Sequence, residues 1–248
     1  MKKLTLSLLL LSGACFADTS VSIYYQGHLQ DPITLSEGTR LDALLRNKLL
    51  PSPIYWRSAQ ITTPARQHEF ELKQAAVIRE LESLASIWRS EGEAQRASSA
   101  TRLAHQLEGI TVTGRLPVIV DPDNAQRSPQ DNPRLEGSYR LFVAARQPQV
   151  AMFGLMEALP TLPLVPGAGV DEYWKRDALL EGADSAHLLL IQPTGDIDMV
   201  PVAVWNKLHR EPMAGAALLV GFDPDLLPSS FARINQRIAE IIANRVPH

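Results

Sequence analysis

The sequence predicts an α+β fold, because strand-like and helical segments occupy separate parts of the chain. β-branched and aromatic residues alternate near the start of the chain and again after Gly109. Between these regions, the stretch 64–109 is rich in Ala, Glu, Gln, Arg and Leu, and the last residues carry an apolar stripe at helical spacing. Runs of strands separated from runs of helices are typical of α+β proteins.

Residues 1–17 have the layout of a secretory signal peptide. Lys2 and Lys3 precede an apolar run at 4–11, and small residues lead to Ala17, which is the order of the three regions of such a signal. The run is shorter than the roughly 20 apolar residues that span a bilayer, and no later stretch reaches that length, so we expect no membrane span. We expect cleavage near Ala17 and a soluble protein in the bacterial periplasm. The alternative is lipoprotein processing at Cys15.

Charge and length exclude several classes of protein. Removal of residues 1–17 takes away two lysines and leaves 22 basic residues against 27 acidic ones, a net charge of −5. No basic run is present that could neutralise a nucleic-acid backbone or an anionic membrane surface, so we expect neither partner. Cys15 is the single cysteine, so the processed chain has no disulfide and depends on the core of one large or two small domains.

The first elements suggest a small mixed sheet. Alternation at 21–25 and again at 33–35 predicts a hairpin, and Thr39 is a candidate N-cap for a short helix at 40–45. A further strand or extended segment is expected at 54–62. A hairpin followed by a helix that packs across the sheet is compatible with a β-grasp unit, among many other α+β folds.

The stretch 64–109 predicts a helical hairpin inserted into a β domain, because it holds no proline after Pro64 and Gly92 interrupts it once. We expect packing helices without a role in ligand binding. The apolar residues at helical spacing are Phe70, Val77, Leu81, Leu84 and Trp88 in the first half and Ala97, Leu103, Ala104 and Leu107 in the second.

Strand patterns return after Gly109, and a polar loop at 124–133 divides them. The expected strands are 110–113, 116–120, 138–144, 150–155, 187–192, 199–205 and 216–222. An amphipathic helix is expected over 226–246, with Asp225, Pro228 and Ser229 near its start. We expect it to dock on its own domain.

Known catalytic and metal-binding motifs are absent from the sequence. The histidines are scattered, and neither G-x-S-x-G, G-x-G-x-x-G nor a P-loop occurs, so we expect no metal and no cofactor. Asp196 and Asp198 lie on one face of an extended segment and could form an acid pair for glycoside cleavage. Because Gly195 precedes them, a hairpin turn is the simpler interpretation, and Asp121 and Asp123 carry the same two interpretations.

Arg115 is the strongest candidate for a binding residue. It lies between Gly114 and Leu116, where two strand-like segments meet. A guanidinium in that position could enter a cleft and bind a carboxylate or phosphate through two N–H groups. The alternative is a structural salt bridge to Asp121 or another acidic residue.

Several motifs, in this order, resemble the capsule biosynthesis GfcC family. The motifs are Thr113-Gly114-Arg115-Leu116-Pro117-Val118 with Asp121-Pro122, the stretch 132–139 (NPRLEGSY), Val202-Ala203-Val204-Trp205-Asn206, His209, Glu211-Pro212-Met213 and Leu219-Val220-Gly221-Phe222. Together with the signal, the hairpin and the terminal helix, the resemblance covers nearly the whole chain.

The resemblance implies two β-grasp domains similar to those of outer-membrane polysaccharide export proteins. On this basis we expect a first domain at 18–148 that contains the hairpin, a second domain at 149–223, and the terminal helix at 224–248. The resemblance also implies a periplasmic protein of capsule or exopolysaccharide operons, and Arg115 matches a family arginine that lies in a cleft.

Two functions are therefore expected, of which the first is favoured because a catalytic constellation is missing. The first is an accessory protein that binds polysaccharide, lipid-linked glycan or an export-machinery partner, with Arg115 and, less strongly, Asp121 and Asp123 as ligand-binding residues. The alternative is an enzyme that modifies or transfers glycan, with Arg115 in a cleft holding an anionic sugar or lipid-pyrophosphate group and Asp121, Asp123 or Glu136 as the base. Aromatic residues that could stack on sugar rings are Tyr24, Tyr25, Tyr55, Trp56, Trp174 and Trp205.

Overall fold

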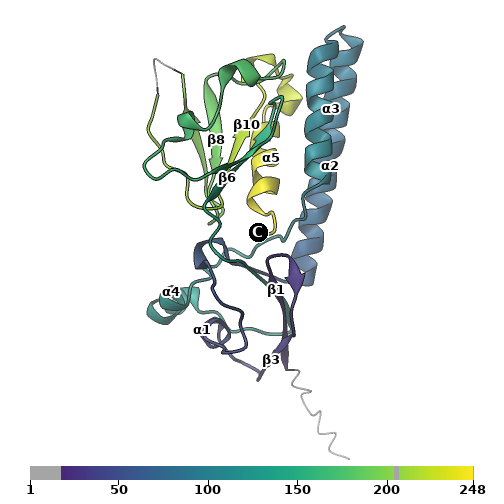
Figure 1. Cartoon of the computed structure of the whole chain (residues 1–248). Helices are drawn as coiled ribbons and strands as arrows, with labels where there is room; N and C mark the ends of the chain where they lie inside the picture. The colour runs from purple at the N-terminus through teal and green to yellow at the C-terminus, as the bar shows by residue number, and fades with distance from the viewer. Residues whose placement is uncertain (1–17, 204–206, 248) are drawn as a thin grey trace, which may run out of the picture.

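The computed structural model describes residues 18–203 and 207–247. These residues form two five-stranded mixed sheets, a long helical hairpin and a helix near the C-terminus (Figure 1). The expected α+β class is therefore confirmed. The signal at residues 1–17 and the Val204–Asn206 part of the family motif lie outside the described residues. Across the described residues, no helix combines the length and apolar character needed to cross a bilayer.

The first sheet has two parallel strands at its centre. Its strands are β1 (Thr19–Tyr25), β2 (His28–Leu29), β3 (Ile33–Leu35), β4 (Gln60–Thr62) and β5 (Ser138–Val143). β1 runs parallel to β5, β4 is antiparallel to β5, and β2 and β3 both pair with the outer edge of β1. Alternate residues of β1 and β5, such as Val21 and Leu141, are buried against α1 (Leu41–Leu45) and α4 (Pro122–Arg127).

The second sheet repeats this arrangement around β6 and β10, which are also parallel. Its strands are β6 (Gln149–Gly154), β7 (Thr161–Pro163), β8 (His187–Ile191), β9 (Ile197–Pro201) and β10 (Ala217–Val220), in the order β7-β6-β10-β8-β9. Helix α5 (Ile234–Ala243) packs on this sheet through its apolar residues, as the sequence predicts. Short 3-10 helices η1 (Trp56–Ser58), η2 (Pro129–Asp131), η3 (Val170–Glu172), η4 (Arg176–Ala178), η5 (Pro224–Leu226) and η6 (Ser229–Phe231) connect the longer elements.

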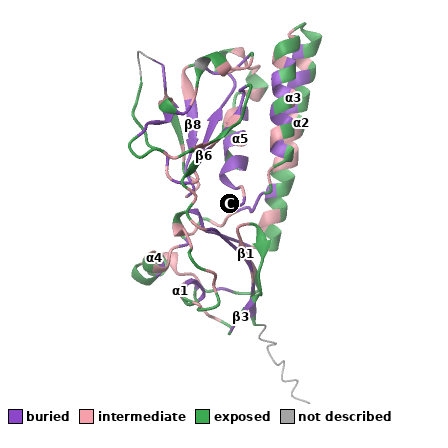
Figure 2. Cartoon of the chain, viewed as in Figure 1, coloured by how far each residue is buried: buried purple, intermediate pink, exposed green. Residues whose placement is uncertain are grey.

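The helical hairpin consists of α2 (Pro64–Ser90) and α3 (Ala94–Glu108). Thr63 caps α2 by accepting a hydrogen bond from the backbone N–H of Arg66, and Pro64 suits the first helical position. All the apolar residues that the sequence assigns to the two helices are buried. In sequence order the hairpin lies between β4 and β5 of the first sheet. Its apolar face nevertheless belongs to the core of the second sheet and α5 (Figures 1 and 2).

The stretch after Gly109 differs from the sequence prediction. No strand forms at 110–113 or at 116–120, and the alternation there yields one isolated bridge between Val112 and Arg245. The reason is local, because Gly114 has a φ of +63° and Pro117 lacks an N–H for a ladder. The expected polar loop at 124–133 begins instead within α4, whose N-cap is Asp121.

The terminal helix is shorter than the sequence predicts. The stretch 226–233 contains η6 and turns, and α5 begins at Ile234. Pro228 directly precedes η6, so the residues that favour a helix start form this 3-10 turn rather than the first turn of α5. The β9 strand ends at Pro201, and the last residues of its predicted range, up to Trp205, lie outside the described part of the chain.

Candidate functional site

Arg115 lies between the two sheets and is hydrogen-bonded to two segments that pack with the second sheet, the end of α5 and the β8–β9 turn. Its backbone N–H donates to Asn244 Oδ1 at 2.9 Å. Its Nη2 donates to the carbonyl of Ala243 at 2.6 Å, at the C-terminal end of α5. Its Nη1 donates to the carbonyl of Pro193 at 3.1 Å, in the β8–β9 turn. Main-chain carbonyls, rather than an acidic residue, therefore hold the guanidinium in place.

Two glycines make room for this arrangement. Gly195, in the β8–β9 turn, has a φ of +100°, and a Cβ there would lie 2.7 Å from Arg115 Nη1. Gly114 has a φ of +63°, and a Cβ there would lie 2.6 Å from the carbonyl oxygen of Arg66 in α2. The turn at Gly195 and the chain before Arg115 therefore both depend on residues without a side chain.

Arg245, which follows α5, supplies a second guanidinium near the end of this helix. Its Nη1 donates to the carbonyl of Ile242 at 3.0 Å, and its Nη2 donates to the carbonyl of Gly215 at 2.5 Å. Its own carbonyl accepts from Gln60 Nε2 at 2.9 Å. The chain that follows α5 is thus attached to β4 of the first sheet, and this attachment places Arg245 beside the junction of the two units.

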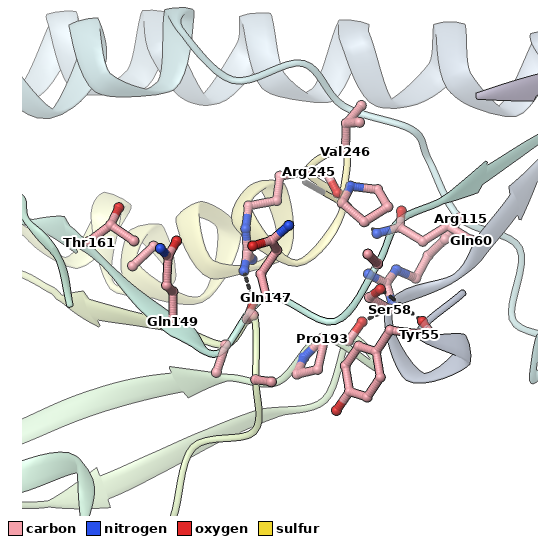
Figure 3. Close-up of a pocket in the computed structure, with 16 residues that line it drawn as sticks. Tyr55, Ser58, Gln60, Arg115, Gln147, Gln149, Thr161, Pro193, Arg245 and Val246 are labelled. Carbon is pink, nitrogen blue, oxygen red and sulfur yellow. Dashed lines mark hydrogen bonds between the residues drawn. The ribbon is translucent and has the colours of Figure 1, made fainter. Parts of the chain in front are cut away.

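Both arginines line one cavity of about 370 Å³, which we call the junction cavity (Figure 3). Residues from both units form its wall, and several of them offer hydroxyl or amide groups. The lining side chains that can hydrogen-bond include Tyr55, Ser58, Gln60, Gln147, Gln149 and Thr161, together with Arg115 and Arg245. A cavity of this size is within the range of small-molecule sites in proteins.

The junction cavity is a positively charged environment. Burial, together with the nearby charge of Arg245, lowers the pKa of Arg115 to about 10, while Asp196 acts in the opposite direction. Burial also lowers the pKa of Arg245 to about 10. Both groups keep their charge at neutral pH. In the described part of the chain neither has a carboxylate within the 4.0 Å of an ion pair, and the buried Nε of Arg115 has no hydrogen-bond partner.

A second, larger cavity of about 680 Å³ lies on the other side of Arg115 and shares Gln60 and Arg115 with the first. Asp121 and Asp196 line this larger cavity, whereas Asp123 and Asp198 do not. Arg115 and Gln60 therefore connect the two cavities. The structure brings Arg115 and Asp121 to one cavity without pairing them, so the expected salt bridge between them is absent.

The remaining candidate acids have structural partners or lie apart. Asp121 Oδ1 accepts from the N–H groups of Asp123 and Asn124, each at 2.9 Å, which is the geometry of a helix cap. Asp123 and Glu136 are exposed. Asp196 lies in the β8–β9 turn and accepts from Thr194 Oγ1 at 2.7 Å, and Asp198 lies on β9. Within the residues described, no group of three potential metal ligands is present.

Sequence reasoning did not identify Arg245 or Gln60 as site residues. Arg245 lies at the end of the predicted terminal helix, where a cation interacts favourably with the helix dipole. The helix dipole alone therefore explains an arginine at this position. Only the return of the chain to the first sheet brings Arg245 to the junction cavity.

Two family models match the chain in succession. The model described as capsule biosynthesis GfcC, N-terminal, matches residues 17–146, and the one described as capsule biosynthesis GfcC C-terminal matches residues 159–247. The chain belongs to the GfcC family. The two GfcC matches divide the chain as the two sheets do, since only β6 of the second sheet lies between them.

A curated relative supports the same assignment. The uncharacterized protein YjbG of Escherichia coli (strain K12) is 29% identical over 252 residues, which cover 100% of this chain and 99% of the relative. The resemblance expected from the sequence motifs is therefore confirmed. The descriptions of both GfcC models connect the family with capsule biosynthesis.

Proposed function

We propose that this protein is a periplasmic accessory protein of capsule or exopolysaccharide biosynthesis and export, which binds polysaccharide or lipid-linked glycan without catalysing a reaction. The observation that carries the proposal is the pair Arg115 and Arg245, two guanidiniums without a carboxylate partner among the described residues, in the wall of one cavity. Guanidinium groups bind carboxylate and phosphate strongly. The surrounding amide and hydroxyl groups match the hydroxyls of a sugar.

The lining of the junction cavity favours binding over catalysis. Its described lining residues include neither a carboxylate nor a histidine that could transfer a proton. A glycan-modifying enzyme is the second candidate, because Asp121 lines the larger cavity together with Arg115. The capping role of Asp121 argues against its use as a base.

We further propose that both sheets are β-grasp domains, at 18–148 and 149–223, followed by the terminal segment 224–248. The support is the topology, since in each sheet the first and last strands are the parallel central pair. β-Grasp domains of outer-membrane polysaccharide export proteins are then the natural partner class. The location requires that residues 1–17 act as a signal that is cleaved near Ala17.

The proposal is tested in a deletion strain complemented with wild-type or variant protein, with polymer display at the cell surface as the readout. Arg115→Ala is expected to abolish display and the binding of the strain's own polymer by the purified protein. Full complementation by Arg115→Ala would place the function on other surfaces. Turnover of the polymer by wild-type protein, lost in Asp121→Asn, would favour the enzyme instead.

A second variant separates binding from stability, because Arg115 also holds α5. Gln147 lines the junction cavity, and none of its side-chain atoms is hydrogen-bonded within the described structure. Gln147→Glu adds a negative charge there without removing a structural contact, so it is expected to fold normally and to lose polymer binding. Gln130→Glu, at an exposed position of η2, is the matched control and should bind as wild type does.

A further inference from the structure

The larger cavity gathers four arginines from four separate segments. Arg57 belongs to η1, Arg66 to α2, Arg115 to the chain between α3 and α4, and Arg127 to the end of α4. We call this surface the arginine groove. Its described carboxylates are Asp121 and Asp196, so the groove has a formal charge of +2 in a chain whose net charge is −3.

The positive charge of Arg57 and Arg127 is available to a ligand, because the carboxylates of the groove have other partners. Asp121 caps α4, and Asp196 accepts from Thr194. Arg66 pairs with Glu69 at 2.7 Å. Arg57 and Arg127 are exposed, and in the described structure neither has a carboxylate within ion-pair distance. Among the described residues, the only side-chain hydrogen bond of Arg127 runs from Nε to the carbonyl of Asp123 at 3.1 Å, which leaves its terminal N–H groups free.

Apolar side chains accompany the arginines. Trp56, directly before Arg57, is partly buried and lines the groove, as do Phe70 and Leu116. Ile119 also lines it and is 55% exposed. A sugar ring has apolar C–H faces that pack on aromatic and aliphatic surfaces. An inorganic anion gains nothing from such contacts, so the combination fits a saccharide that carries negative charges.

We propose that the arginine groove binds a segment of an acidic, carboxylate-bearing polysaccharide, whose carboxylates are held by Arg57 and Arg127. This inference rests on the proposed function and names the class of glycan that the protein recognises. The volume of about 680 Å³ exceeds that of the junction cavity and suits several linked sugars better than one. Because Arg115 lines both cavities, one polysaccharide molecule can contact both of them.

The test is a calorimetric titration of the purified full chain with short oligogalacturonides, a carboxylate-bearing probe, at low and at moderate salt. Arg57→Gln combined with Arg127→Gln is expected to weaken binding about tenfold and to reduce its salt dependence. Because both side chains are exposed, the double variant is expected to keep its fold, which the thermal unfolding temperature checks.

The matched control is Arg89→Gln combined with Arg233→Gln. Arg89 lies at the end of α2 remote from the groove, and Arg233 lies at the N-terminal end of α5, opposite Arg115. Both are exposed, and the control removes the same net charge. Binding by the control is expected to equal that of wild type. Equal losses in the two double variants would mean a general charge effect and would overturn the groove assignment.

Two further probes define the ligand class. Neutral maltooligosaccharides of the same length should bind at least tenfold more weakly than oligogalacturonides. Equal binding of the neutral probe would overturn the assignment to an acidic glycan. Equal binding of polyglutamate would also overturn it, in favour of an acidic protein partner. If Gln147→Glu abolishes binding of the strain's own polymer while the Arg57/Arg127 variant binds normally, the proposed function stands and this inference fails. If wild type binds no glycan, both fail.

Discussion

Arg115 shows how one residue can serve structure and binding together. Its guanidinium is held by the carbonyls of Pro193 and Ala243, and it still presents an unpaired positive charge to both cavities. Carbonyls fix its orientation without cancelling its charge, which an acidic partner would do. The arrangement depends on the absence of a side chain at Gly195.

We predict that Gly195→Ala displaces the Arg115 guanidinium. A methyl group 2.7 Å from Nη1 forces the arginine to move, and the φ of +100° adds backbone strain. The expected result is a loss of about 1–2 kcal/mol of stability and a loss of polymer binding comparable to that of Arg115→Ala. Thermal unfolding and titration with the polymer measure the two effects.

Gly27→Ala is the control for this substitution. Gly27 lies in the β1–β2 turn with a φ of +81°, and a Cβ there would meet nothing within 4 Å. It is expected to lose stability by strain alone and to bind polymer normally. Equal binding by both glycine variants would show that the position of Arg115 does not matter for binding.

At the scale of elements, the hairpin is a structural support for the second sheet. The sequence places α2 and α3 within the first unit, yet their buried residues contact α5 and the second core. Arg237 of α5 also pairs with Glu80 of α2. The hairpin thereby links the two units along its length (Figure 1).

We predict that Leu84→Ala destabilises the protein by about 2–5 kcal/mol, because Leu84 is 0% exposed in the shared core. Leu72→Ala on the same helix is the control, since Leu72 is 58% exposed and should change stability by about 0.5 kcal/mol or less. Thermal unfolding followed by circular dichroism compares the two. A small effect of Leu84→Ala would mean that α2 does not share the core of the second sheet.

At the scale of the whole molecule, the segment after α5 ties the two units together. The backbone N–H of Thr113 donates to the carbonyl of Asn244 at 2.8 Å, and Val246 donates to the carbonyl of Thr111 at 3.0 Å. The hydroxyl of Thr113 bonds Gln60 of the first sheet and also the carbonyl of Asn244. These contacts hold the segment that carries Arg245 against the segment that carries Arg115.

We predict that Thr113→Val loosens this connection. The substitution keeps the shape of the side chain but leaves Gln60 Oε1 without its buried donor, which costs about 1–3 kcal/mol. Hydrogen exchange should become faster at the backbone N–H groups of positions 113 and 246, while the central strands stay protected. Thr101→Val is the control, since in the described part of the chain the Thr101 hydroxyl bonds only the carbonyl of Ala97 within α3. Unchanged exchange at Val246 would show that the connection does not depend on Thr113.

The sequence by itself determined the elements whose stability is local. Periodic apolar residues predicted α2, α3 and β1, because burial on one face leaves a repeating pattern in the chain. A continuous apolar run predicted β10, which is buried along its whole length. The same pattern failed at 110–120, where β-branched residues alternate but Gly114 and Pro117 prevent a ladder. Arg115 was found because its neighbours mark a junction between segments.

Tertiary structure alone decided what surrounds Arg115. Arg245, Gln60 and the β8–β9 turn are far from it in sequence, and no local pattern records that they meet at one cavity. The arginine groove has the same origin, since its four guanidiniums come from four separate segments, of which only that of Arg115 is distinguished by its local sequence. Exposed charged residues do not recur at a regular spacing in the sequence, so their meeting point cannot be predicted from it. The packing of the two units brings these groups together.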